Sequence, residues 1–172
     1  MKKRLEALVG LPASQEGRKK KFEEDVETWK AEVERIDKGC VNGEAIWAAP
    51  DFNDAAWKSM KVPGLMQEQD LPGFSGLVWF RKTIDIPTGW AGKDLILNLG
   101  VIDDNDFTYF NGIQIGHTEG WMAPRSYKIP KELVKKGKAV IAVRVMDTGG
   151  TGGINGSPES ISLHRSQLDA IP

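Results

Sequence analysis

The residues of this sequence that are best suited to catalysis do not form a known catalytic motif. Hydrolysis of the triad type needs a nucleophile on a strained turn and a histidine that can reach it. The sequence has no Gly-x-Ser-x-Gly segment and no Gly-Asp-Ser block, and its two histidines, His117 and His164, stand outside any motif. Together with the single Cys40 they also give no zinc-ligand spacing. We therefore expect no catalytic residue and no cofactor in this chain.

An acidic segment, Asp103-Asp104-Asn105-Asp106, offers several of the oxygen ligands that calcium prefers. It lacks the glycine at the sixth position and the distal glutamate of an EF-hand loop. Asp and Asn are also common in turns, because their side chains hydrogen bond to nearby backbone groups. The segment therefore predicts a turn or rim, with a calcium site at Asp103, Asp104 and Asp106 as the alternative.

A glycine-rich loop runs from Asp147 to Ser157. It lacks the Lys-Ser/Thr ending and the following helix of a phosphate-binding loop. Its glycines permit close approach of the backbone to a ligand or to another chain. Two interpretations stay open, a plain connection between strands and an interface with substrate or with a neighbouring domain. The interface residues would be Asp147, Gly149, Gly150, Gly152, Gly153 and Asn155.

Trp121 and Arg125 flank an irregular polar segment. An exposed indole stacks on the apolar face of a sugar ring, and an arginine can hold a carboxylate through two hydrogen bonds. These two residues, with Trp79 as a further platform, are candidates for a substrate or interdomain surface. The alternative is that Trp121 is buried and closes one end of the fold.

The stretch from Leu95 to Gly116 must position these residues, and it predicts three consecutive antiparallel strands. Leu95, Leu97 and Leu99 alternate with other residues at a period of two, which places them on one face of a strand. Asn111-Gly112 predicts a type I′ hairpin turn, because both central residues of that turn need a positive φ.

Further strands are expected at residues 57–62, 77–86, 127–129, 141–145 and 161–163, with turn signals between them. About eight short strands behind one long helix are typical of a mainly β protein. The sequence therefore predicts an antiparallel β-sandwich or jelly roll.

A long amphipathic helix is expected before the strands, with its start capped by Ser14 or Gln15 and with Gly39 just past its end. It would pack on this domain or lean on a neighbouring one. We expect a helical extension at residues 1–39 and a sandwich domain at residues 40–172. The apolar residues of the helix form one stripe, Phe22, Val26, Trp29, Val33 and Ile36.

Composition excludes several classes of protein. The 172 residues carry a net charge of −1, and the only basic cluster is Arg18–Lys21, so a nucleic-acid partner is not expected. No apolar run approaches the roughly 18 residues that span a bilayer, so no membrane segment is expected. The basic start, Met-Lys-Lys-Arg-Leu, is not followed by an uninterrupted apolar segment, and we expect no signal peptide in this chain.

Several segments together resemble one family pattern. They are Trp57…Val62-Pro-Gly, Val78-Trp-Phe-Arg-Lys82, Leu95…Leu99-Gly, Ile102-Asp-Asp…Asp106, Tyr109-Phe-Asn-Gly112…Ile115-Gly and Arg144-Val-Met-Asp147. This pattern is similar to that of the jelly-roll sugar-binding domain of glycoside hydrolase family 2 enzymes. The segments Ile102–Gly112 and Asp147–Ile154 are more similar still to the domain inserted in bacterial sialate O-acetylesterases. The resemblance covers most of the chain, from Trp47 to Leu163.

The resemblance implies a galactose-binding-like sandwich with a non-catalytic role, either structural or in positioning substrate. In the parent esterases a separate SGNH-type hydrolase domain removes O-acetyl groups from sialic acid, and this chain has none of that domain's motifs. By analogy with the family 2 glycosidases, Asp147–Ser157 would face the hydrolase domain or its substrate. The resemblance also implies a periplasmic or secreted location. The alternatives are an autonomous carbohydrate-binding module with a glycan as partner, and a plain interaction domain, which an exposed apolar stripe at Phe22–Ile36 would favour.

Overall fold

The computed structural model describes residues 14–166, and the chain divides into two compact units, Met1–Ile36 and Asp37–Pro172. Residues 1–13 of the expected helical extension (1–39) lie outside the described residues. The predicted division at residue 39 stays a prediction. Within the described residues, no helix combines the length and the apolar character that crossing a membrane requires.

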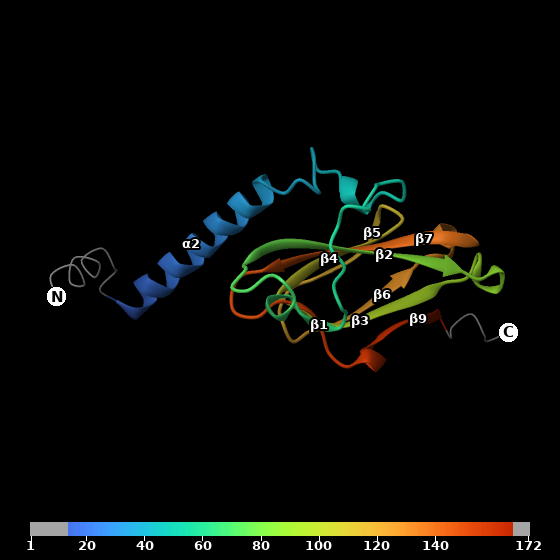
Figure 1. Ribbon diagram of the computed structural model, residues 1–172. Helices are drawn as coiled ribbons and strands as arrows, with labels where there is room; N and C mark the ends of the chain where they lie inside the picture. The colour runs from blue at the N-terminus through green and yellow to red at the C-terminus, as the bar shows by residue number, and fades with distance from the viewer. Residues whose placement is uncertain (1–13, 167–172) are drawn as a thin grey trace. The chain divides into compact units, whose positions relative to one another are not determined.

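The described part of the first unit is helix α2 (Gln15–Arg35; Figure 1). Ser14 caps its start as predicted, because the Ser14 side chain accepts a hydrogen bond of 3.0 Å from the backbone N–H of Gly17. The helix ends at Arg35 with Ile36 as its C-cap, earlier than the prediction that placed Gly39 just past its end. Gly39 is instead buried in the second unit, where a Cβ would lie 2.4 Å from Nε1 of Trp79.

The second unit is the predicted β-sandwich, made of two antiparallel sheets (Figure 1). One sheet has the order β1-β8-β3-β6, and β9 also pairs with β3. The other has the order β2-β7-β4-β5. The first sheet contains β1 (Gly64–Leu65), β3 (Leu95–Asp103), β6 (Pro124–Ile129), β8 (Gly153–Asn155) and β9 (Ile161–Arg165). The second contains β2 (Gly76–Ile86), β4 (Asn105–Phe110), β5 (Ile113–Thr118) and β7 (Gly137–Asp147).

The hydrophobic core lies between these sheets and follows the predicted alternation. Leu95, Leu97 and Leu99 of β3 are buried, with exposed fractions of 5% or less. They belong to the same apolar cluster as Ile141 and Val143 of β7, which come from the other sheet. Burial of such alternating residues on both inner faces is the main force that holds a sandwich together.

The central stretch from Leu95 to Gly116 differs from its prediction in one respect. Its three strands form, and Asn111 and Gly112 have positive φ values of 49° and 82° at the hairpin turn between β4 and β5. However, β3 belongs to one sheet and β4 to the other, so they are not antiparallel neighbours. The predicted acidic turn is also shorter than expected, because β3 ends at Asp103 and β4 begins at Asn105.

The predicted strand at 57–62 does not form, and two short strands were missed. The backbone of Lys61 pairs with a side chain, because Gln69 accepts a hydrogen bond from Lys61 N at 2.6 Å and donates one to Lys61 O at 3.0 Å. The missed strands are β1 and β8, which pair with each other through Gly64↔Ile154 and Leu65↔Gly153. Strands of two and three residues are too short to show a period of two.

An aromatic cluster covers the outer face of the four-stranded sheet. Trp47 packs edge-on against Trp57 and Trp79, with ring centroids 5.2 and 6.1 Å away. Arg81 holds this segment in place through an ion pair of 2.9 Å with Asp54 and a hydrogen bond to the carbonyl oxygen of Trp47. Trp79 is only 7% exposed, so the predicted use of Trp79 as a sugar platform is wrong.

Candidate functional site

Segments that are far apart in the chain meet at one end of the sandwich, which we call the loop end. It comprises the β3–β4 connection at Asp104, the β5–β6 loop at residues 119–123 and the β7–β8 loop at residues 148–152. They meet because β4 runs antiparallel to both β5 and β7, so that the last residues of β5 and β7 lie beside the first residues of β4. The loop end therefore brings together most of the site residues that the sequence predicted.

Asp147 is fully buried and holds the glycine-rich loop through hydrogen bonds. Its carboxylate accepts hydrogen bonds from Nε2 of Gln67 at 2.7 Å and from the backbone N–H of Gly149 at 2.8 Å. Gln67 also accepts a hydrogen bond of 2.8 Å from Gly152 N, so that one glutamine holds both ends of the loop. A Cβ on Gly152 would lie 2.5 Å from Oδ2 of Asp147, which explains a glycine at that position.

The other glycines of this loop divide into two groups. Gly153 has a φ of +135°, and a Cβ there would lie 2.6 Å from the carbonyl oxygen of Gly64. The glycines predicted a close approach of the backbone to a ligand or to another chain. At Gly153 the backbone instead lies close to β1 of the same chain. Gly149 and Gly150 are exposed with open space around them, whereas Asn155 is half-buried in β8. Residues 148–151 are the part of the loop that is open to a partner.

Asp104 ties the β3–β4 connection to the same loop. Its Oδ2 accepts hydrogen bonds from the backbone N–H and the hydroxyl of Thr148, at 2.8 and 2.5 Å. The neighbouring Asp103 is half-buried. Burial, a hydrogen bond with Asp104 and the negative charges of Asp104 and Asp147 together raise the pKa of Asp103 to about 7. A raised pKa of this size at the end of a strand is typical of a functional site, although structural networks also produce it.

The acidic segment Asp103–Asp106 does not form a calcium site, which was the alternative to a turn or rim. Asp106 lies inside β4 and is fully buried, and the carboxylate of Asp104 is used by Thr148. Among residues 14–166, no group of three or more histidine, cysteine, aspartate or glutamate side chains is arranged to hold a metal ion. Asp103, Asp104 and Asp106 therefore do not converge on one cation.

Arg125 and Asp106 form an ion pair between the two sheets. Nε of Arg125 lies 2.8 Å from Oδ1 of Asp106, and neither side chain has any exposed surface. The hydroxyl of Tyr127 donates to the same carboxylate at 2.9 Å. The predicted clamp role of Arg125 is therefore corrected, since its guanidinium is used inside the protein. Its other N–H groups donate to the carbonyl oxygens of Asp104, Thr118, Gly120 and Ala123.

Trp121 and Met122 are exposed on the β5–β6 loop, with exposed fractions of 58% and 67%. The alternative of a buried Trp121 is therefore wrong. The loop beneath them is held by the guanidinium of Arg125 and by a hydrogen bond of 3.0 Å from Gly120 N to the side chain of Asn105. Two large apolar side chains are thus presented to solvent from a firmly held backbone, an arrangement that suits binding.

Neither histidine is paired with a serine in the described part of the chain. Nδ1 of His117 lies 2.7 Å from the carbonyl oxygen of Asp106, and its ring stacks on Phe107 with the centroids 4.1 Å apart. Nε2 of His117 lies 3.5 Å from Glu119. His164 is exposed on β9. Neither environment resembles a serine activated by a histidine base.

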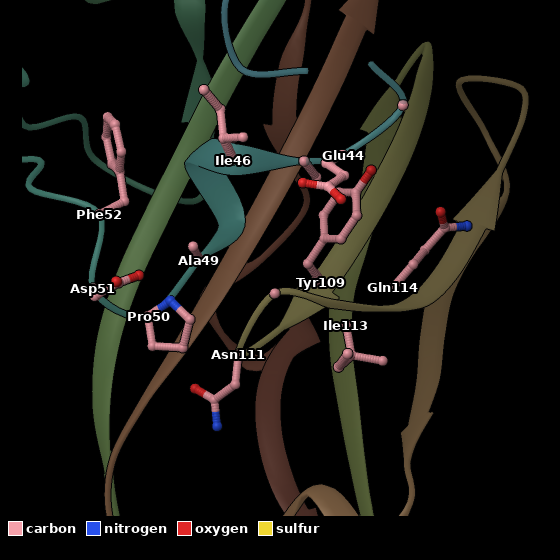
Figure 2. A pocket seen from close by; sticks show the side chains of 13 residues that line it. Glu44, Ile46, Ala49, Pro50, Asp51, Phe52, Tyr109, Asn111, Ile113 and Gln114 are labelled. Carbon is pink, nitrogen blue, oxygen red and sulfur yellow. The ribbon is translucent and has the colours of Figure 1, made fainter. Parts of the chain in front are cut away.

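A pocket of about 800 Å³ lies at the opposite end of the sandwich, beside the β4–β5 turn. Figure 2 shows side chains from the segment Glu44–Phe52 and from the β4–β5 hairpin lining it. Its lining residues include no lysine, arginine or histidine, so the pocket does not suit an anionic ligand. Its size is in the usual range for small-molecule sites. The polar side chains that line it include Glu44, Asp51, Asn111 and Gln114.

No family model matches the chain. Solved structures of carbohydrate-active enzymes do resemble it. A β-glucuronidase from Bacteroides uniformis is 25% identical, with a TM-score of 0.57 over 66% of this chain and 15% of that chain. A member of glycoside hydrolase family 2 from Bacteroides cellulosilyticus is 22% identical, with a TM-score of 0.55 over 69% of this chain and 18% of that chain. The β-glucuronidase 2 of B. uniformis is 24% identical, with a TM-score of 0.55 over 62% of this chain and 14% of that chain.

This chain contains a β-sandwich domain like those of family 2 glycoside hydrolases. The likeness confirms the predicted β-sandwich fold. This chain corresponds to between 14% and 18% of each of these enzymes.

Sequence reasoning missed Gln67, the residue that holds both ends of the glycine-rich loop. Gln67 lies in a stretch of loop residues with no periodic pattern, and nothing in the sequence links it to Asp147, which is 80 residues away. It also missed Met122, whose exposure beside Trp121 becomes evident only once the β5–β6 loop is seen to be held from inside.

Replacing Asp106 by asparagine is expected to lower the free energy of unfolding by about 3–5 kcal/mol, because it leaves the buried guanidinium of Arg125 without its counter-ion. Urea denaturation of both proteins measures this difference. Lys58→Gln is the control, since Lys58 pairs with Asp70 on the surface at 3.4 Å and such pairs contribute about 1 kcal/mol or less. A loss in Asp106→Asn no larger than in the control would contradict the structural role of the ion pair.

Replacing Asp103 by asparagine is expected to flatten the pH dependence of stability. The pKa of Asp103 is 3.8 in its ordinary state and about 7 in the folded chain, so the folded state binds more protons between these values. The free energy of unfolding of the wild type therefore falls as the pH rises through this window. Urea denaturation at pH 5 and pH 8 should show a smaller fall in Asp103→Asn, whereas the exposed control Asp85→Asn should follow the wild type. Equal falls of the free energy of unfolding in all three proteins would contradict the raised pKa of Asp103.

Proposed function

We propose that this chain is the non-catalytic sandwich domain of a carbohydrate esterase of the sialate O-acetylesterase type, and that its loop end meets the hydrolase domain or its substrate. The structural likeness to family 2 enzymes supports a domain that is one part of a larger carbohydrate-active protein. The esterase assignment rests on the sequence resemblance at Ile102–Gly112 and Asp147–Ile154. The periplasmic or secreted location belongs to the same proposal.

The observation that carries the positioning role is the build of the loop end. Asp147, Gln67 and Arg125 are used internally and hold the loops in place. What they present outward is the exposed pair Trp121 and Met122 and the open backbone of residues 148–151. Such a surface offers apolar contact area and the exposed backbone of Gly150 and Thr151, and His117 near it does not lie against a serine. It therefore suits docking and positioning rather than bond cleavage.

The full chain is expected to hydrolyse neither O-acetylated N-acetylneuraminic acid nor p-nitrophenyl acetate above the rate of the buffer. The reason is that neither histidine lies against a serine. Release of acetate and of p-nitrophenol measures the two reactions. His117→Ala is the matched variant, because turnover that the wild type shows and this variant lacks would prove the chain to be an enzyme in its own right.

The alternative function is an autonomous carbohydrate-binding module. The exposed Trp121 favours it, as does the pocket beside the β4–β5 turn, whose carboxylates and amides are the groups that hydrogen bond to sugar hydroxyls. The absence of cationic side chains from the pocket lining restricts that site to neutral sugars or to neutral parts of a glycan.

Calorimetric titration of the full chain with lactose and with sialyllactose separates the two functions. A positioning domain without its hydrolase partner should show no saturable binding to either sugar. Saturable binding that Trp121→Ala abolishes would move the function to a binding module with its site at the loop end. Saturable binding of lactose that Gln114→Ala abolishes and Trp121→Ala leaves intact would place the site in the pocket instead, because Gln114 is exposed on the pocket lining.

A further inference from the structure

Helix α2 carries an apolar stripe, and none of the side chains in this stripe is buried. None of the residues of α2 is buried, and Phe22 and Ile36 at the two ends of the stripe are 68% and 58% exposed. The residues between them, Val26, Trp29 and Val33, are only half-buried. A row of five large apolar side chains, none of them buried, is typical of a surface that binds another protein segment.

The spacing of this stripe is that of a coiled coil. Its residues follow one another at intervals of four, three, four and three, so that Val26 and Val33 occupy heptad position a, and Phe22, Trp29 and Ile36 occupy position d. A helix that packs on a globular domain has a wider apolar face, with a third apolar residue in each heptad. The narrow seam therefore fits one partner helix of the same kind.

The charges beside the seam fit a second copy of α2 in parallel orientation. In a parallel coiled coil, position g of one helix lies next to the following position e of the other. These pairs are Arg18 with the second copy's Glu23, and Asp25 with its Lys30, and both join opposite charges. The next pair would be Glu32 with Asp37, which carry like charges, but Asp37 lies beyond the helix and is held by Arg144 at 2.7 Å.

The antiparallel arrangement brings like charges together instead. There, position g faces position g and position e faces position e. Of the two registers that pair the apolar residues, one offsets two attractive Glu23–Lys30 pairs with two repulsive Asp25–Glu32 pairs. The other places Lys30 opposite Lys30 and Glu32 opposite Glu32. The ion pairs within one helix, such as Lys21–Asp25 at 3.2 Å, are exposed and weak, so they can rearrange at little cost on association.

We propose that α2 associates with α2 of a second copy of this chain as a parallel two-stranded coiled coil, which makes the protein a dimer through its helical extension. This inference is independent of the proposed function, since it rests on the helix alone. A dimer would present two loop ends at once, and two linked sites bind a repeated ligand more tightly than one.

Sedimentation equilibrium of the full chain tests the association. The wild type is expected to be a reversible dimer. Val33→Asp is expected to raise the dissociation constant at least 100-fold, because it places a carboxylate in the seam. The control is Ala31→Asp, which puts the same charge at the exposed position f and should change the dissociation constant by no more than about twofold. A wild type that stays monomeric overturns the proposal, and so does a dimer that Val33→Asp leaves intact.

Charge reversal tests the orientation with variants that leave the seam unchanged. Asp25→Lys and Lys30→Glu should each weaken the dimer by about three- to tenfold, since each places like charges next to each other across the interface. The double variant should recover most of the wild-type affinity, because it restores both pairs with their signs exchanged. A double variant that is no tighter than the single ones would exclude the parallel arrangement.

Discussion

The buried ion pair between Asp106 and Arg125 is the interaction on which the loop end depends. Asp106 is on β4 and Arg125 is on β6, so the pair joins one sheet to the other across the core. A buried ion pair is no more stabilising than an apolar pair of the same shape, because both charges lose their hydration. It does, however, allow only one arrangement, since every donor and acceptor must find a partner. Here Tyr127 and four backbone carbonyl oxygens supply those partners.

The choice of arginine matters for what the ion pair can hold. A guanidinium has five N–H donors in a fixed plane, and after pairing with Asp106 the others remain available to the backbone. Through them Arg125 fixes the connection at Asp104 and the loop that carries Trp121 at the same time. Asp104 in turn holds Thr148 of the glycine-rich loop. A single residue in the core thus sets the positions of all three segments of the loop end, which leaves little freedom in the backbone beneath the exposed side chains.

Most of the fold could be predicted from the sequence, because burial between two sheets imposes a period of two on strands such as β3 and β7. The hairpin turn was also predictable, since Asn111 and Gly112 tolerate the positive φ values that it needs. What could not be predicted depends on distant partners. Strand β3 pairs with β6, and β4 pairs with β7, so the two consecutive strands belong to different sheets. No local pattern in the sequence shows this.

The structure brings most of the predicted site residues together at the loop end, and it gives several of them other roles than those predicted. Acids, glycines, a tryptophan and an arginine marked the right segments, because polar and special residues concentrate in loops. Sequence alone does not tell a residue that holds a loop from one that touches a partner. Arg125 and Asp147 are buried and hold loops, whereas Trp121 is exposed, and this difference in burial depends on the whole fold.

The exposed apolar side chains of the described chain are not spread evenly over its surface. Many of them gather in three places, which are the stripe of α2, the pocket beside the β4–β5 turn and the pair Trp121–Met122 at the loop end. Exposed apolar groups that are clustered, and presented from a firmly held backbone, have a cost in solubility that scattered ones do not. Since the sandwich is already closed around its own core, none of these clusters is needed for folding. Clustered exposed apolar side chains of this kind are typical of surfaces that contact other molecules.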